Sequence, residues 1–134
     1  MARICKVLVV EDNRDIQDLL ETVFADEGYH FTCVSDGAGM RRVLAMDEAV
    51  DIVIIDVVLP GGEDGLALAS VAHAHGCGVI LVTGSHDQFA RIEESGHCYA
   101  LKPFSLRSLL ALVDEVLKET QARCVVKERQ YGAS

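Results

Sequence analysis

The sequence contains no tryptophan, only two prolines and no apolar run long enough to span a membrane, since a membrane helix needs about 20 consecutive apolar residues. Residues 1–13 lack the small-residue cleavage site of a secretory signal, and they include the two acids Glu11 and Asp12. We therefore expect a protein of the cytoplasm with no membrane segment.

Basic residues are also scarce. The 12 Lys and Arg residues are outnumbered by 21 Asp and Glu residues, which leaves a net charge of −9. Proteins that bind nucleic acids or acidic membrane surfaces need clustered basic side chains, so we expect neither partner here. The 134 residues, half of them hydrophobic, predict a single domain with its own core.

The five cysteines form no C-x-x-C motif, and the five histidines show no zinc-binding spacing. In a chain without an export signal, reduced thiols are expected. Cys5, Cys33 and Cys98 fall in apolar runs, and we expect them to be small buried side chains. His73 and His75 would face different sides of a helix, so the histidines are interpreted as surface residues.

Apolar runs alternate with amphipathic runs along the chain. Short apolar runs rich in β-branched residues predict strands at residues 4–10, 30–34, 51–56, 78–83 and 98–102. Apolar residues recurring every three or four positions predict helices after Asn13, over about ten residues following the turn at Asp36 and Gly37, from about 65 to 75 and after Ser105, with a polar and weak helix at 86–95.

Five strand–helix units in succession predict an α/β fold with a doubly wound, five-stranded parallel sheet and helices on both faces. The expected strand order is 2-1-3-4-5, as in a flavodoxin-like (βα)5 fold. We expect residues 1–122 to form the domain. Residues 123–134, which show no clear period, are expected to be a C-terminal tail or a linker stub.

Polar side chains follow the predicted strands at one edge of this sheet. Glu11 and Asp12 follow the first strand, while Asp56, Thr83 and Lys102 end the third, fourth and fifth. The carboxyl ends of parallel strands form the edge where α/β proteins bind ligands. Three adjacent carboxylates repel one another unless a cation compensates, and oxygen ligands without Cys or His favour Mg²⁺. A nucleophilic carboxylate with nearby hydroxyl and ammonium donors fits an incoming phosphoryl group.

These residues stand in motifs that resemble one known family. The stretches VVEDN, VIIDVVLP, VTG and CYALKPF, each at a predicted strand end, are together similar to the receiver domains of two-component response regulators. The similarity covers about residues 4–120. It implies that Asp56 accepts a phosphoryl group and that Glu11, Asp12, Asp56 and the backbone carbonyl of Val58 hold Mg²⁺.

The resemblance also implies how the site would act as a switch. Thr83 and Lys102 would contact the attached phosphoryl group, and Tyr99 would turn inward as Thr83 is drawn to it. This would change the surface of the fourth helix, the fifth strand and the last helix. The peptide bond between Lys102 and Pro103 is expected to be cis. Slow autodephosphorylation is the one enzyme-like activity implied.

We therefore expect a single-domain response regulator. A histidine kinase or a histidine phosphotransfer protein would phosphorylate it, and it would control a downstream protein as a monomer or a weak phosphorylation-dependent dimer. Two alternatives stay open: a receiver fragment of a larger regulator or hybrid kinase, and a pseudo-receiver that binds partners without phosphorylation. A haloacid-dehalogenase-type phosphatase is disfavoured, because it needs a second Asp where this chain has Val58.

Two stretches depart from the usual receiver pattern. The loop PGGEDG, residues 60–65, has one extra residue between its proline and its Asp–Gly pair. The position of the Val58 carbonyl therefore depends on how this loop folds. The interval from Thr83 to Lys102 is shorter than usual, and we expect the helix at 86–95 to be short or mobile.

Overall fold

The computed structural model describes residues 3–46, 49–120 and 124–125. The strands are β1 (Arg3–Ile4), β2 (Lys6–Val10), β3 (His30–Val34), β4 (Ile52–Asp56), β5 (Gly78–Thr83), β6 (Cys98–Leu101) and β7 (Cys124–Val125). The helices are α1 (Arg14–Asp26), α2 (Gly37–Met46), α3 (Gly65–Ala74), α4 (Phe89–Ser95) and α5 (Leu106–Glu119), with 3-10 turns η1 (Pro60–Gly62) and η2 (His86–Gln88).

Strands β2 to β6 form one parallel sheet in the order β3-β2-β4-β5-β6. Numbered along the chain, these five strands have the order 2-1-3-4-5, so the predicted α/β fold is confirmed. Every residue of β5 is buried, and so are Ile52 to Ile55 of β4. This explains why both strands are continuous apolar runs, since central parallel strands are covered on both faces.

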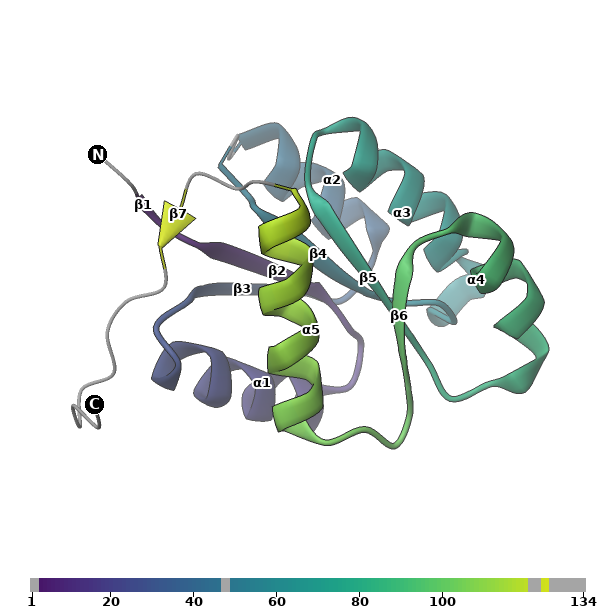
Figure 1. Ribbon diagram of the computed structural model, residues 1–134. Helices are drawn as coiled ribbons and strands as arrows, with labels where there is room; N and C mark the ends of the chain where they lie inside the picture. Colours follow the sequence, from purple (N-terminus) through teal and green to yellow (C-terminus); the bar gives the residue numbers. More distant parts are fainter. Residues whose placement is uncertain (1–2, 47–48, 121–123, 126–134) are drawn as a thin grey trace.

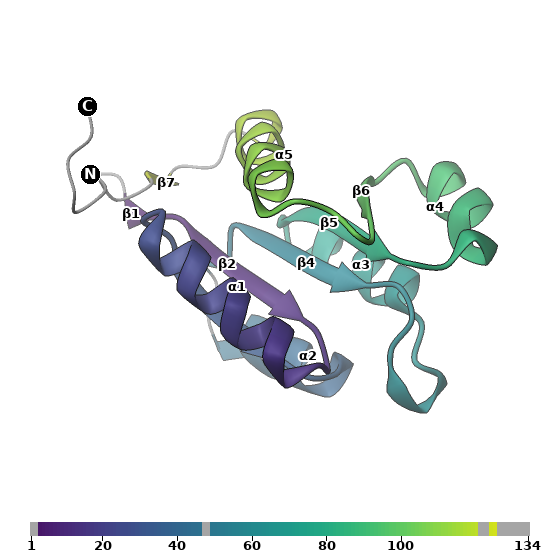
Figure 2. The same ribbon diagram turned by 90° about the horizontal axis from the view of Figure 1, so that it is seen from below.

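Helices cover the sheet on both sides (Figures 1 and 2), with α1 and α5 on one face and α2, α3 and α4 on the other. Alternate side chains of a strand point to opposite faces. Leu8 and Val10 of β2 accordingly pack in the core beneath α2, α3 and α4, whereas Val7 and Val9 pack beneath α1 and α5. The sheet therefore carries a core on each face, and the strand ends are left for a site.

Four helices begin at a side chain that caps them. The side chains of Asn13, Asp36, Asp64 and Ser105 each accept a hydrogen bond from a backbone N–H in the first turn of α1, α2, α3 and α5, as N-cap residues commonly do. Helix α4 has no such cap and only 7 residues, so the prediction of a short fourth helix is confirmed. Its mobility stays a prediction.

The first predicted strand is interrupted at Cys5. Strand β1 leaves the main sheet and pairs in parallel with β7, inside the segment interpreted as a tail. The remaining tail residues, 123 and 126–134, lie outside the described residues. No helix in the described part of the chain is long and apolar enough to cross a membrane.

The cysteines differ from expectation. Cys5 is buried and disulfide-bonded, so the expectation of a reduced thiol is wrong at this position. Strand β1, which ends directly before Cys5, pairs with β7 at Cys124 and Val125. Cysteine spacing alone cannot reveal such a contact between segments far apart in the sequence. Cys33, Cys77 and Cys98 are free, and Cys33 and Cys98 are only partly buried, because both lie on edge strands of the sheet.

Candidate functional site

The carboxyl ends of β2 and β4 bring three carboxylates together. Glu11 and Asp12 follow β2, and Asp56 is the last residue of β4, the strand beside β2. One oxygen from each carboxylate lies within 4.8 Å of the other two. Within the described ranges, no other three acidic, histidine or cysteine side chains have this spacing. The structure thus places the three predicted acids in one cluster.

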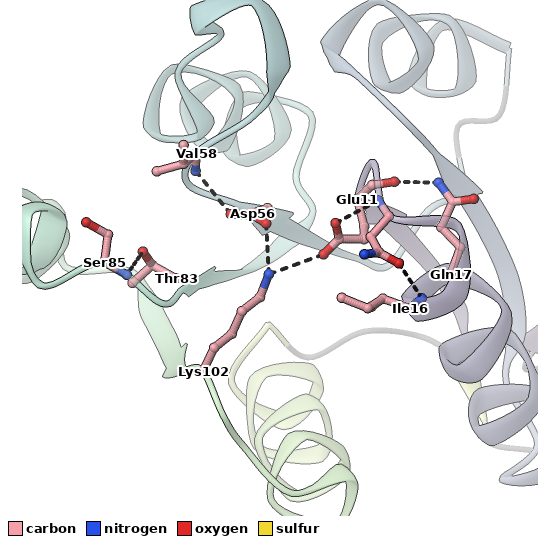
Figure 3. A network of polar contacts seen from close by, with 9 residues as sticks. Glu11, Ile16, Gln17, Asp56, Val58, Thr83, Ser85 and Lys102 are labelled. Atoms are coloured by element: carbon pink, nitrogen blue, oxygen red, sulfur yellow. Dashed lines mark hydrogen bonds and ion pairs between the residues drawn. The ribbon is translucent and has the colours of Figure 1, made fainter.

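Lys102 reaches into this cluster from just beyond β6 (Figure 3). Its Nζ lies 3.0 Å from Asp56 Oδ2 and 3.4 Å from Glu11 Oε1. The side chain of Lys102 is 32% exposed, against 12% for Asp56 and 7% for Glu11. Burial alone would lower the pKa of Lys102, but the hydrogen bonds and charges of Asp56 and Glu11 together raise it. The ammonium group therefore stays charged at neutral pH and offsets part of the negative charge.

Glu11 is the more enclosed of the two carboxylates that Lys102 contacts. Its Oε2 accepts a hydrogen bond from the Asn13 N–H at 3.0 Å. Burial raises the pKa of Glu11, and the nearby Asp56 and Asp12 raise it further, although Asn13 and Lys102 act in the opposite direction. Burial is thus the largest cause of the raised pKa, and the neighbouring carboxylates add to it.

The chain that follows Asp56 holds its carboxylate in place. The Val58 N–H donates to Asp56 Oδ1 at 3.1 Å, and the Val57 N–H donates to the Val82 carbonyl at 2.9 Å. At Gly65, a Cβ atom would lie only 2.3 Å from the Asp56 carbonyl oxygen. Helix α3 can begin this close to β4 only because Gly65 has no side chain. One oxygen of the carboxylate is thus fixed by backbone, and the other is left for the ammonium group.

The loop with the extra residue is anchored on two sides. Glu63 accepts a hydrogen bond from the Gly37 N–H, the first residue of α2, at 2.7 Å. Asp64 accepts one from the guanidinium of Arg91 in α4, also at 2.7 Å. Gly61 in η1 has φ of 73°, a conformation that glycine adopts without strain. The longer loop is therefore tied to α2 and α4, and the role of the Val58 carbonyl as a metal ligand stays a prediction.

Thr83 lies at the end of β5 with only 1% of its surface exposed. Its Oγ1 accepts a hydrogen bond from the Ser85 N–H at 3.1 Å, and its carbonyl accepts one from the Lys102 N–H at 2.8 Å. The peptide bond between Lys102 and Pro103 is cis, as the resemblance implies. Thr83 and Lys102 are thus joined through the backbone at the same edge as the acids.

Tyr99 contacts α4 in this structure. Its hydroxyl donates a hydrogen bond to Glu93 at 2.9 Å, which raises the pKa of Tyr99. Its ring also packs edge-on against Phe89, with ring centroids 5.5 Å apart. Both partners belong to the short helix α4, so the position of Tyr99 is coupled to that helix.

Gln17 is a residue of this region that the sequence reasoning missed. It is 8% exposed, and its side-chain amide donates to the backbone carbonyl of Glu11 and to Ser35 Oγ. It therefore supports the segment that carries the first two acids (Figure 3). A signal was available, because Gln17 lies three and seven residues before the apolar Leu20 and Phe24, on the buried side of α1.

The donor set of the cluster fits a hard divalent cation. All three side chains offer carboxylate oxygens, and no histidine or thiol is among them. Mg²⁺ prefers oxygen ligands and keeps several of its waters. The exposed Asp12 leaves one side of the cluster open to solvent for them.

Comparisons with known proteins agree with this arrangement. The sequence matches the family described as "Response regulator receiver domain" over residues 7–114. It is 37% identical over 122 residues to the transcriptional regulatory protein GltR of Pseudomonas aeruginosa, a match that covers 86% of this chain and 50% of GltR. The chain spans about half the length of the curated relatives that it matches.

Solved structures are also similar. The receiver domain of the TMAO respiratory system response regulator TorR is 34% identical, with a TM-score of 0.77 over 87% of this chain and 98% of that one. The response regulator TrrA of Thermotoga maritima, solved in complex with Mg²⁺ and BeF, has a TM-score of 0.74. Its identity is 24%, over 84% of this chain and 99% of that one, and this likeness shows the fold alone.

Proposed function

This chain belongs to the response regulator receiver domain family, and on that premise we propose that Asp56 accepts a phosphoryl group from a phosphohistidine. One observation carries the proposal: Asp56 ends a central strand within the carboxylate cluster, with the Lys102 ammonium 3.0 Å from one of its oxygens. A carboxylate held in this way is a positioned nucleophile. The family has its place in two-component signalling, so the donor would be a histidine kinase or a histidine phosphotransfer protein.

We further propose that Glu11, Asp12, Asp56 and the Val58 carbonyl hold Mg²⁺. The all-oxygen donor set supports this assignment, and TrrA, a structural neighbour, was solved with Mg²⁺ and BeF. When bound, the ion would supply positive charge for the oxygens of the transferred group.

The residues of the chain would share the remaining work of the transfer. A carboxylate oxygen of Asp56 forms a bond to phosphorus while the bond from phosphorus to the donor imidazole nitrogen breaks, and that nitrogen keeps the electron pair. Lys102 compensates negative charge on the acceptor side. The Thr83 hydroxyl accepts a hydrogen bond from Ser85 but still has its own proton to donate to a phosphoryl oxygen. Slow autodephosphorylation would follow by attack of water on the same phosphorus.

Tyr99 would then transmit the phosphorylation of Asp56 to the surface of the domain. As Thr83 moves toward the phosphoryl group, we propose that Tyr99 leaves Glu93 and turns inward. Its two present partners, Glu93 and Phe89, belong to α4, so the change would reach the surface formed by α4, β6 and α5. This is a shift between two arrangements of one fold.

An apolar cavity beside Asp56 supports the proposal that a protein carrying a phosphohistidine docks on this domain. It has a volume of about 440 Å³ and opens between α1 and the start of α5, beside Asp56. Its lining includes Ile16, Leu19, Phe104 and Leu106, and Leu19 is 51% exposed. We propose that a helix of the phosphohistidine donor docks here, with its apolar side chains in the cavity.

Two routes of output remain within the proposal. The chain would control a downstream protein in the cytoplasm, as a monomer or as a weak dimer after phosphorylation. Alternatively, it would act as the receiver part of a longer regulator, since GltR and TorR are named transcriptional regulatory proteins and are about twice the length that this chain covers.

The proposal is tested by measuring the mass of the intact protein after incubation with acetyl phosphate and Mg²⁺. We expect the wild type to gain one phosphoryl group that is lost on alkaline hydrolysis. Asp56→Asn should gain none. Asp87→Asn, the same substitution at an exposed aspartate of η2, is the matched control and should behave as the wild type. An adduct that persists in Asp56→Asn would refute the assignment of Asp56 as the acceptor. If the wild type gains no adduct, the proposal of phosphorylation is wrong, and the hypothesis of a pseudo-receiver that binds partners without phosphorylation replaces it.

A further inference from the structure

A second cavity lies at the opposite end of β5 and β6. Its volume is about 340 Å³, and it is bounded by the end of α3, the turn between α4 and β6 and the end of α5. Five side chains that can bind metals line it: His73, Cys77, His97, Cys98 and Glu119. None of them takes part in the phosphoryl site.

Two imidazole rings lie edge-on to each other in the lining of this cavity. The ring centroids of His73 and His97 are 5.9 Å apart, at an interplanar angle of 68°. A zinc–nitrogen bond is about 2.0–2.1 Å long, and a ring centre lies about one ångström beyond the bonded nitrogen. Two rings that share one ion therefore have centres about 5–6 Å apart, close to the separation observed here.

The imidazoles and the thiol of Cys77 differ in accessibility. His73 is exposed and His97 is partly exposed, whereas Cys77 is buried. The Cys77 thiol also donates to the Val50 carbonyl at 3.4 Å. The imidazoles are therefore more accessible to an ion from solvent than the Cys77 thiol.

The rim of the cavity is open on both sides. Gly76 after α3 and Gly96 after α4 have φ of 84° and 76°, and no atom lies within 4 Å of where a Cβ would stand on either. Water can therefore complete the coordination of an ion. Glu119 on α5 adds a negative charge at the rim.

We propose that His73 and His97 together bind one borderline divalent cation of the Zn²⁺ class, with water in the remaining positions. Imidazole nitrogen suits Zn²⁺ and not Mg²⁺, so this site and the carboxylate cluster select different ions. The bound ion would link the end of α3 to the turn before β6. With two protein ligands, binding is expected to be weaker than at a structural zinc centre, which has four.

The test follows the imidazole resonances of the whole protein by NMR during titration with Zn²⁺, with Mg²⁺ in excess to occupy the carboxylate cluster. We expect the resonances of His73 and His97 to shift together and to saturate at one equivalent. His73→Gln and His97→Gln should each weaken binding by about tenfold or more, since even the loss of a group that only orients a ligand costs about 10–100-fold.

His75→Gln is the matched control, because His75 is exposed and follows α3 directly, and it should leave the affinity unchanged. Repeating the titration with Asp56→Asn should give the same shifts. Three results would overturn the proposal: shifts spread over all five histidines, no shift at His97, or an affinity that His97→Gln leaves unchanged. In those cases the two rings are only packed against each other.

Discussion

The two ends of the central strands carry different chemistry. At the carboxyl end, Asp56 lies among oxygen donors with Lys102 as its cation. At the amino end, the cavity before β5 and β6 is lined by the imidazoles of His73 and His97 and by two thiols. The first set suits a hard ion and a phosphoryl group, and the second suits a borderline ion. A single parallel sheet can thus collect two unlike sets of ligands, because its loops meet at two opposite edges.

The ends also differ in how tightly their charge is compensated. At the carboxyl end, three carboxylates share one ammonium group, and the pKa of Glu11 is raised as a result of burial and crowding. At the amino end, burial is the first cause of the raised pKa values of Cys77 and Cys98, and one acid, Glu119, lies at the rim. The carboxyl end should therefore respond strongly to charge changes, and the amino end only weakly.

The largest effect is expected for Lys102→Met. It removes the ammonium group from Asp56 and Glu11, and the loss of one positioned donor to a transferring group costs about 100-fold in rate. The measurement is the rate of phosphorylation by acetyl phosphate with Mg²⁺. Lys118→Met removes a lysine from an exposed pair with Asp114 and should leave the rate unchanged. Equal rates in both variants would contradict the role of Lys102.

The next effect concerns packing behind the carboxyl end. Gly65→Ala places a Cβ atom 2.3 Å from the Asp56 carbonyl oxygen, so the start of α3 must shift. We expect a loss of about 1–3 kcal/mol in the free energy of unfolding, measured by urea denaturation. Gly84→Ala is the control, since its nearest contact would be an ordinary 3.5 Å. A Gly65→Ala protein as stable as Gly84→Ala would show that α3 does not depend on this close approach.

The free energy of unfolding should depend on pH through Glu11, which lies at the carboxyl end. Because the folded-state pKa of Glu11 is raised above 4.5, the protonated group contributes stability that is fully present below pH 4.5 and is lost as the pH rises through the raised value. Urea denaturation in the presence of chelator should therefore show this loss in the wild type and not in Glu11→Gln. Glu94→Gln, at an exposed residue, should keep the wild-type profile. Saturating Mg²⁺ should restore stability, by about 2.7 kcal/mol at 100 times its Kd.

The smallest effect is expected at the loop that carries the extra residue. Glu63→Ala removes the acceptor of the Gly37 N–H and should cost about 1 kcal/mol of unfolding free energy. Glu63→Gln keeps an acceptor oxygen and should cost less. If both substitutions lower the unfolding free energy equally, the hydrogen bond from Gly37 does not hold the loop. The length of the loop alone then sets the position of the loop.

Sequence reasoning reached the fold and the main cluster for a physical reason. Buried parallel strands are apolar runs that can be read directly, and the residue after each run must lie at the carboxyl edge. Glu11, Asp12, Asp56, Thr83 and Lys102 were all placed in this way. Contacts made by side chains across distant segments were not predictable, among them the carboxylate of Glu63 on α2 and the guanidinium of Arg91 on Asp64.

The sequence by itself determined the order of strands and helices and the acids at one edge, because these follow from the period of the apolar residues. The tertiary structure alone decided which distant groups touch. It paired β1 with β7, turned Tyr99 toward α4 and set His73 opposite His97, although these two histidines are 24 residues apart and fit no known metal spacing. Packing of the helices on the sheet fixes such contacts, and no local pattern encodes them.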